Sequence, residues 1–180
     1  MRVDQLRREY AVVVEWRAFL LDPTTPPEGK RYTDPPEARA QRGAPMRAMA
    51  AAVGLEIADR DFVANSRLAL EAAEFARDRE LFEPFHRAVF DAYFAEGRDI
   101  GRLDELRAIA RAVGLDEAAL VTALEERRYA PRVDEDVELA ARIGISAVPA
   151  FIIGNRAILG AQPYEVFEQV MALYGREKLA

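Results

Sequence analysis

The sequence predicts an α/β fold in which a large helical block interrupts one small sheet. Residues 11–20 change from charged residues to a β-branched run, which is typical of a strand. From about residue 37 to 143 the apolar residues recur at helical spacing. A proline then opens a second apolar run, 149–159, with Gly154-Asn155 at its centre, as in a tight hairpin. So few strands cannot build a core alone, which favours an insertion within one sheet over two sequential domains.

Length and charge narrow the class of protein. A chain of 180 residues with 51% hydrophobic residues is long enough for one well-cored domain with a subdomain. Its net charge of −6 argues against nucleic-acid binding, which needs a clustered basic surface. The longest uncharged run, 143–155, is too short to cross a bilayer, and the charged N-terminal residues 1–10 lack the apolar core of a secretory signal. We therefore expect a cytoplasmic protein without a nucleic-acid or membrane partner.

The 180 residues contain no cysteine and one histidine. Disulfides, thiolate nucleophiles and thiolate metal sites are therefore excluded within this chain. A metal site is not expected either, because His86 has neither a second histidine nor a cysteine to join it.

Local signals predict the order of the elements. Residues 2–9 resemble the charged end of a helix, and the five prolines of 22–36 predict a long loop. Asn65-Ser66 is a cap signal for the helix that follows, as is Asp116. Further apolar periodicity predicts helices over 81–92, 103–113, 117–124, 133–141 and from 163 onward. The acidic run Asp134, Glu135, Asp136 and Glu138 is interpreted as a solvated helix start.

Four segments, in order, resemble the DsbA-like branch of the thioredoxin superfamily, which includes FrnE-type proteins and 2-hydroxychromene-2-carboxylate isomerases. They are Trp16–Pro23, Asn65–Leu70, the F-H-x-A-x-F…E-G-x-D-I-like run Phe85–Ile100, and Gly144–Pro149 with Gly160–Pro163. The resemblance implies a thioredoxin-like fold with a large all-helical insertion. Residues 1–34 and 144–180 would form a discontinuous thioredoxin-like subdomain, and 35–143 the helical insertion subdomain.

The chain departs from this family at its beginning. The family opens with a strand and a Cys-x-x-Cys motif at a helix N-terminus, where the helix dipole lowers the thiol pKa, and the isomerases place a serine there. Neither the strand nor the motif is present, and residues 2–9 match the far end of the family's first helix. Three explanations stay open: a longer natural protein with the motif, a gap closed by a rearranged sheet or another chain, or a redox-inactive relative. Open strand edges predict a homo-oligomer, specifically a dimer.

The resemblance also implies where a substrate binds. A cis Val148-Pro149 bond would turn the backbone of Ala147 and Val148 toward an extended peptide or glutathione, which would pair with it as a strand. The alternative is a trans proline that starts an edge strand. Glutathione would be a co-substrate, and no other cofactor is implied. His86 is a candidate accessory residue, although its helical spacing with Phe82 and Phe90 favours a packing role.

The implied function is that of a DsbA/FrnE-like thiol-disulfide oxidoreductase family protein, redox-inactive as given because the chain has no cysteine. The alternatives are a glutathione-dependent isomerase relative and a non-enzymatic peptide-binding protein of thioredoxin fold.

Overall fold

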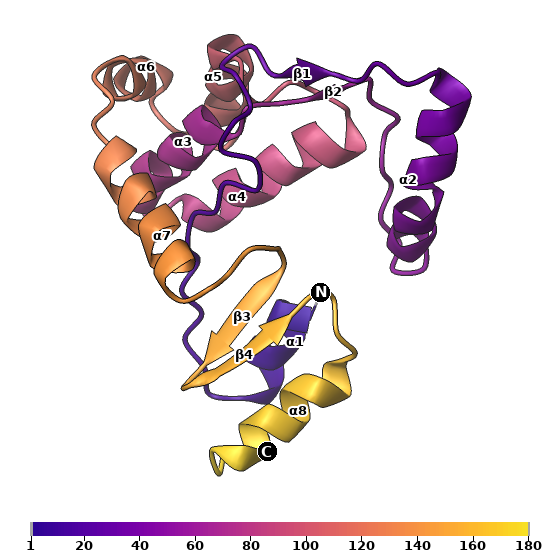
Figure 1. The fold of residues 1–180 in the computed structure, drawn as a ribbon. Helices are drawn as coiled ribbons and strands as arrows, with labels where there is room; N and C mark the ends of the chain where they lie inside the picture. Colours follow the sequence, from indigo (N-terminus) through magenta and orange to yellow (C-terminus); the bar gives the residue numbers. More distant parts are fainter. Residues whose placement is uncertain (1, 180) are drawn as a thin grey trace. The chain divides into compact units, whose positions relative to one another are not determined.

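The computed structural model describes residues 2–179 (Figure 1). The helices are α1 Arg2–Glu9, α2 Pro36–Ala51, α3 Arg67–Arg77, α4 Phe82–Phe90, the π-helical turn η1 Asp91–Ala95, α5 Leu103–Ala112, α6 Glu117–Glu125, α7 Ala130–Arg142 and α8 Tyr164–Leu173. The strands are β1 Lys30–Arg31, β2 Phe62–Val63, β3 Ala150–Ile153 and β4 Arg156–Leu159. In each of the two sheets, β1–β2 and β3–β4, the strands run antiparallel.

The chain divides into two compact units, residues 1–21 with 136–180 and residues 22–135. The sequence analysis places the boundaries after residues 34 and 143 instead. In the structure, residues 22–34 belong with the helices because β1 pairs with β2. The end of α7 belongs with the hairpin unit because Asp136 binds the segment before residue 21.

The second unit is built around α3, which packs against α4, α5 and α6. Apolar residues at helical spacing in these helices meet in one core, where Phe75, Phe85, Leu106 and Leu120 are fully buried. Burial of each such side chain stabilises the fold by about 1.5–3 kcal/mol. The helical block predicted for residues 37–143 is confirmed in these helices, whereas β2 lies where a helix was expected.

The two predicted caps differ in detail. Asp116 caps α6, because its Oδ1 accepts hydrogen bonds from the N–H groups of Ala118 and Ala119 at 2.9 and 3.0 Å. At α3 the side chain of Asn65, rather than that of Ser66, receives the N–H of Arg67 at 2.9 Å. The Asn65 amide also donates to the Thr25 carbonyl at 2.7 Å, so it joins the start of α3 to the long proline-bearing loop.

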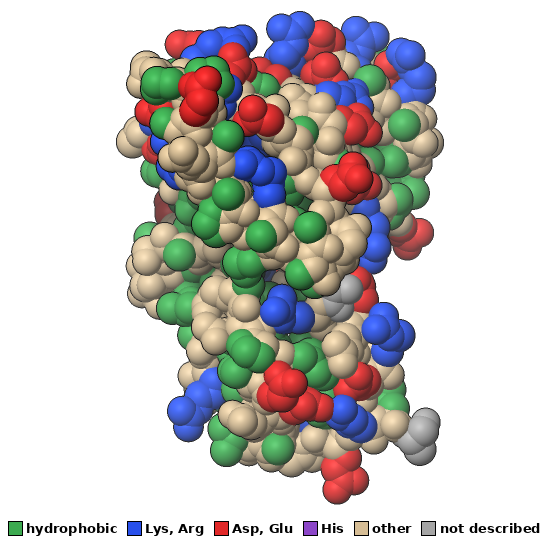
Figure 2. Space-filling view, turned by 90° about the vertical axis from the view of Figure 1, so that its right-hand side faces the viewer, with side chains coloured by type: hydrophobic (Ala, Val, Ile, Leu, Met, Phe, Trp, Pro, Cys, Tyr) green, Lys and Arg blue, Asp and Glu red, His purple; other side chains and the backbone are tan. Residues whose placement is uncertain are grey.

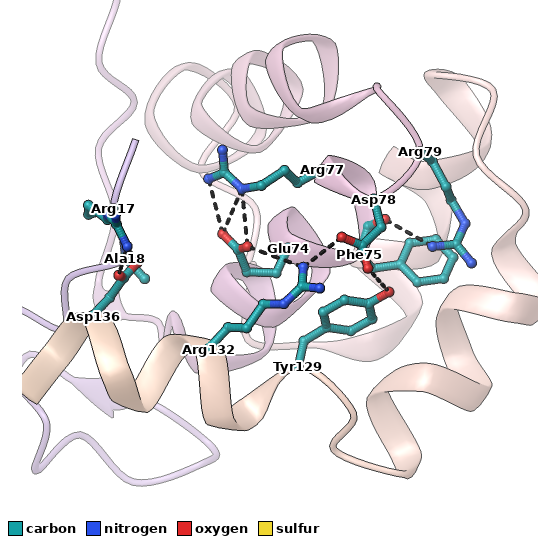
Figure 3. A network of polar contacts seen from close by, with 10 residues as sticks. All are labelled: Arg17, Ala18, Glu74, Phe75, Arg77, Asp78, Arg79, Tyr129, Arg132 and Asp136. Atoms are coloured by element: carbon teal, nitrogen blue, oxygen red, sulfur yellow. Dashed lines mark hydrogen bonds and ion pairs between the residues drawn. The ribbon is translucent and has the colours of Figure 1, made fainter. Parts of the chain in front are cut away.

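Charged side chains inside the second unit form bonded networks. Glu71 is fully buried and is held by Arg67 at 3.2 Å and Arg127 at 2.7 Å. In Figure 3, Arg132 bonds Asp78 at 2.6 Å and Tyr129 donates to the same carboxylate at 2.9 Å. The bond from Arg132 lowers the pKa of Asp78 below its ordinary value.

The first unit is a hairpin packed on α1 and α8. The register places Phe151 opposite Ile158, and both side chains face Phe167, whose ring meets that of Phe151 edge-to-face at 4.9 Å. The turn is Gly154-Asn155, as predicted. Gly154 has φ +58° and a Cβ there would lie 2.4 Å from the Tyr174 ring, so two independent features demand glycine.

Residues 11–20 are not a strand, so this prediction is wrong. The segment is extended, with Val12, Trp16 and Ala18 turned toward the protein and Val13 99% exposed. This alternation is the one a strand shows, but a strand also needs a neighbouring strand for its backbone groups, and no strand among the described residues 2–179 pairs with this segment.

A carboxylate from α7 fixes the far end of this segment. In Figure 3, Asp136 accepts hydrogen bonds from the Ala18 N–H at 2.7 Å and from the Arg17 guanidinium at 3.0 Å. The interpretation of the acidic run as a solvated helix start is wrong for Asp136, which is buried, whereas Asp134, Glu135 and Glu138 are exposed as expected. The helix begins at Ala130, so the acidic run lies inside the helix rather than at its start. Asp136 is buried where it accepts these two hydrogen bonds.

The surface mixes both signs of charge. On the face that Figure 2 shows, Lys and Arg side chains are interspersed with Asp and Glu side chains. Among residues 2–179, no helix has the length and apolarity that a membrane crossing requires.

Candidate functional site

The loop between α7 and β3 contains the predicted binding residues, and a helix cap sets its direction. Gly144 ends α7 with φ +76°, a conformation that favours glycine. The N–H of Gly144 bonds the Ala141 carbonyl at 3.2 Å, and the N–H of Ile145 bonds the Ala140 carbonyl at 2.8 Å. These two bonds form a Schellman motif, which turns the chain sharply away from the helix axis.

Beyond this cap the backbone is exposed. Ala147, Val148 and Pro149 are all exposed, and Val148 keeps half of its accessible surface (50%). The Val148–Pro149 peptide bond is cis. The Pro149 carbonyl accepts the N–H of Gly160 at 2.8 Å, which extends the β3–β4 ladder up to the loop.

The backbone of Ala147 and Val148 remains available. Within residues 2–179 neither their N–H nor their C=O groups form a hydrogen bond. These groups directly precede β3, whose chain continues in the extended conformation. Exposed backbone groups beside a strand provide what an extended peptide needs for pairing.

The outer face of the hairpin is apolar. Ile152 is 52% exposed and Leu159 is 50% exposed, and both lie on the face opposite to Phe151 and Ile158. The loop with its free backbone therefore borders an exposed apolar surface in the same unit.

His86 lies in α4, in the second unit. Its ring is stacked between two aromatic rings, 5.3 Å from Phe82 and 4.6 Å from Phe90. Burial is the main cause that lowers the pKa of His86 below its ordinary value. The structure thus brings Ala147, Val148 and Pro149 together in one loop, and places His86 in an aromatic stack on a different unit.

The groups that this loop offers to a ligand are the backbone N–H and C=O groups of Ala147 and Val148. Over the described part of the chain, no group of three His, Cys, Asp or Glu residues could hold a metal ion.

Sequence reasoning missed Asp136, which positions the segment before residue 21. Asp136 stands in a run of acidic residues, and such runs are usually exposed near the start of a helix, so the sequence did not indicate that this carboxylate is buried.

Comparison with known proteins shows the family. The sequence model of the DSBA-like thioredoxin domain matches residues 1–172. The chain belongs to the DSBA-like thioredoxin domain family. The resemblance found in the sequence is thereby confirmed, as is the thioredoxin-like α/β fold.

One curated relative and two solved structures illustrate what this chain is similar to. The uncharacterized protein YwbO of Bacillus subtilis is 34% identical over 169 residues, which are 89% of this chain and 82% of that protein. A crystal structure described as a probable DsbA oxidoreductase from Streptomyces coelicolor has a TM-score of 0.79 at 27% identity, and the match covers 88% of this chain and 74% of that one. A 2-hydroxychromene-2-carboxylate isomerase has a TM-score of 0.72 over 97% of this chain and 85% of that one, and at 17% identity it shows the common fold alone.

Proposed function

We propose that this DsbA-like chain binds an extended peptide at Ala147, Val148 and Pro149, as the substrate-binding part of thiol-disulfide exchange. The observation behind this proposal is the exposed, unbonded backbone of Ala147 and Val148 directly before β3. The reacting thiols do not come from these 180 residues, which contain no cysteine.

The mode of binding is strand addition. Main-chain hydrogen bonds to Ala147 and Val148 would provide affinity with little dependence on sequence, and neighbouring side chains would provide selectivity. Ile152 and Leu159 present an apolar surface, so apolar residues in the peptide are preferred. Glutathione, a short peptide that carries a thiol, satisfies the same backbone groups and is the co-substrate in this proposal.

A titration followed by NMR tests the site. The 15N-labelled chain is titrated with an apolar hexapeptide and, separately, with S-methylglutathione. We expect saturable shifts centred on the amides of residues 146–152. Shifts confined to other parts of the chain would refute the site.

Two proline variants remove the proposed backbone donors. Val148→Pro and Ala147→Pro each delete one N–H, so peptide affinity should fall about tenfold or more, the value of a hydrogen bond lost from a bound complex. Val148→Thr keeps the N–H and the β-branched shape and serves as the control, which should bind within about twofold of the original chain. Far-UV circular dichroism verifies that each variant is folded. Equal affinity in a folded proline variant would mean that the backbone groups are not used.

Turnover separates the alternatives. We expect no insulin reduction by the 180-residue chain, because no thiol is present to exchange. Binding of S-methylglutathione without binding of apolar peptides would favour the glutathione-dependent isomerase alternative. If a natural form of the protein with additional N-terminal residues binds the same peptides but has no disulfide exchange activity, a non-enzymatic binding role would be favoured.

A further inference from the structure

The helix α2 departs from the charge pattern of the other helices. It has a single acidic residue, Glu37, but three arginines, Arg39, Arg42 and Arg47. Their spacing of three and then five residues places the arginines on one broad face of the helix. The chain as a whole has a net charge of −6, so this face is a local reversal of sign.

A cavity lies between this face and the loop before β2. It has a volume of about 210 Å³ and is lined by the three α2 arginines, by Arg60 and by one carboxylate, Asp59. Tyr32 and Met46 contribute apolar surface to the same cavity. All of these residues belong to the second unit.

Carboxylates do not balance the four guanidinium groups. Arg42 is paired with Asp34, and Arg39 Nε lies 3.6 Å from Asp59 Oδ1, which is an ion pair but too long for a hydrogen bond. Arg47 folds back onto the carbonyl of Ala40, a neutral acceptor.

Arg60 is held by an aromatic ring rather than by an anion. Its guanidinium lies over the ring of Tyr93, 3.7 Å from the centroid. Two positive groups of the cavity, Arg47 and Arg60, therefore have no carboxylate partner among the described residues.

Two donors of the cavity are buried without an acceptor. Arg39 Nε and Arg60 Nη1 have no hydrogen-bond partner within residues 2–179. The Arg39 side chain is only 15% exposed. A buried donor left unsatisfied destabilises a fold by about 1–3 kcal/mol, and more when it is charged, so an acceptor bound between these two donors would stabilise the cavity.

We propose that this cavity binds a small oxyanion, a carboxylate or a phosphate group, through Arg39 and Arg60. Guanidinium groups match both oxyanions because their N–H donors lie in a fixed plane that meets two oxygens at once. Sites for drug-sized ligands measure about 300–1,000 Å³, so 210 Å³ fits a small anion or the anionic end of a longer molecule. The cavity is formed by residues of the second unit alone, whereas residues 147–149 belong to the first unit, so this proposal does not rest on the proposed peptide site.

Isothermal titration calorimetry at low ionic strength tests this proposal on the full chain. The probes are inorganic phosphate and acetate, with chloride as the reference anion. We expect saturable binding of at least one probe at concentrations where chloride gives no heat of binding. Phosphate alone would identify a tetrahedral oxyanion, acetate alone a carboxylate, and no preference over chloride would overturn the proposal.

Matched variants locate the binding. The double variant Arg39→Gln and Arg60→Gln should weaken the preferred probe about tenfold or more, because hydrogen bonds to charged groups are lost. Arg102→Gln with Arg111→Gln removes the same charge at exposed ion pairs outside the cavity and should leave affinity within about twofold. Equal weakening by both pairs would show a general charge effect and refute the site. Unchanged far-UV circular dichroism and urea midpoint establish that the cavity variant is folded.

Discussion

The buried carboxylate of Asp136 accepts a hydrogen bond of 2.7 Å from the N–H of Ala18, a residue 118 positions earlier in the chain. The same carboxylate receives the Arg17 guanidinium at 3.0 Å. One side chain of α7 thus fixes an extended segment that no neighbouring strand holds within residues 2–179.

Removal of this carboxylate should therefore release the segment. Asp136→Ala leaves the Ala18 N–H without an acceptor, and we expect the free energy of unfolding to fall by about 1–3 kcal/mol. Glu135→Ala, at an exposed position on the same helix, should change it by less than about 0.5 kcal/mol. Urea unfolding followed by circular dichroism measures both. A similar loss in the two variants would contradict the role of Asp136.

Glu71 is a second carboxylate on which packing depends. Glu71→Ala breaks its pairs with Arg67 and Arg127, and we expect a loss of about 3 kcal/mol, the lower end for a buried pair because both arginines retain contact with water. Glu125→Ala, an exposed change at the end of α6, is the control. Denaturation midpoints that coincide for the two variants would argue against this network.

His86 should make stability depend on pH. Its pKa is lowered in the folded chain because the ring is buried between Phe82 and Phe90, whereas in the unfolded chain it is about 6.5. The unfolded state then binds more protons between the folded value and 6.5, so this contribution is complete above about pH 6.5 and is lost as the pH falls below it. The positive charges of Arg87 and Arg77 also lower the pKa of His86, whereas the negative charge of Glu83 raises it.

The His86→Phe variant isolates this term, because phenylalanine keeps an aromatic ring but does not titrate. As the pH falls from about 7.5 to about 5.5, one unit on either side of the unfolded-state pKa of about 6.5, the free energy of unfolding should decline less in the variant than in the original chain. Parallel pH profiles would show that His86 does not titrate in this range.

Unpaired extended backbone favours self-association, as the proposal of a dimer requires. Val13 is 99% exposed within residues 11–20, and no strand among the described residues 2–179 pairs with this segment. Light scattering should give a mass above the 20.2 kDa of one chain, and Val13→Lys should shift it toward the monomer because a charge disfavours edge pairing. Leu173→Lys, on exposed surface of α8, is the control. If the original chain, without either substitution, remains a monomer at high concentration, the proposal of a dimer is refuted.

The sequence predicted the elements whose signals are local. The two residues Gly154 and Asn155 are sufficient to predict the turn between β3 and β4, and Asp116 caps a helix through its own side chain. The helices of the second unit followed from apolar spacing, because each buries one face against the same core.

The failures concern interactions between distant residues. The run 11–20 has the composition and alternation of a strand, but composition does not supply a partner for the backbone. Asp136 lies in an acidic run that resembles a solvated helix, and only the approach of Ala18 explains its burial. The arginines of α2 were overlooked among the many charged residues, although a sequence signal existed, namely arginines on one helix face with a single acidic residue in that helix.

Helix α2 has consequences for local dynamics. No residue of this described helix is fully buried, although Arg39 is partly covered, and Pro45 removes one of the backbone hydrogen bonds of the helix. An isolated helix of this length is marginal in water, so α2 should melt and reform while α3 stays intact. Its amide protons should then exchange with deuterium sooner than those of α3, and an anion bound by Arg39 would slow that exchange. The rate of amide exchange in one helix would thus report whether an oxyanion occupies the cavity.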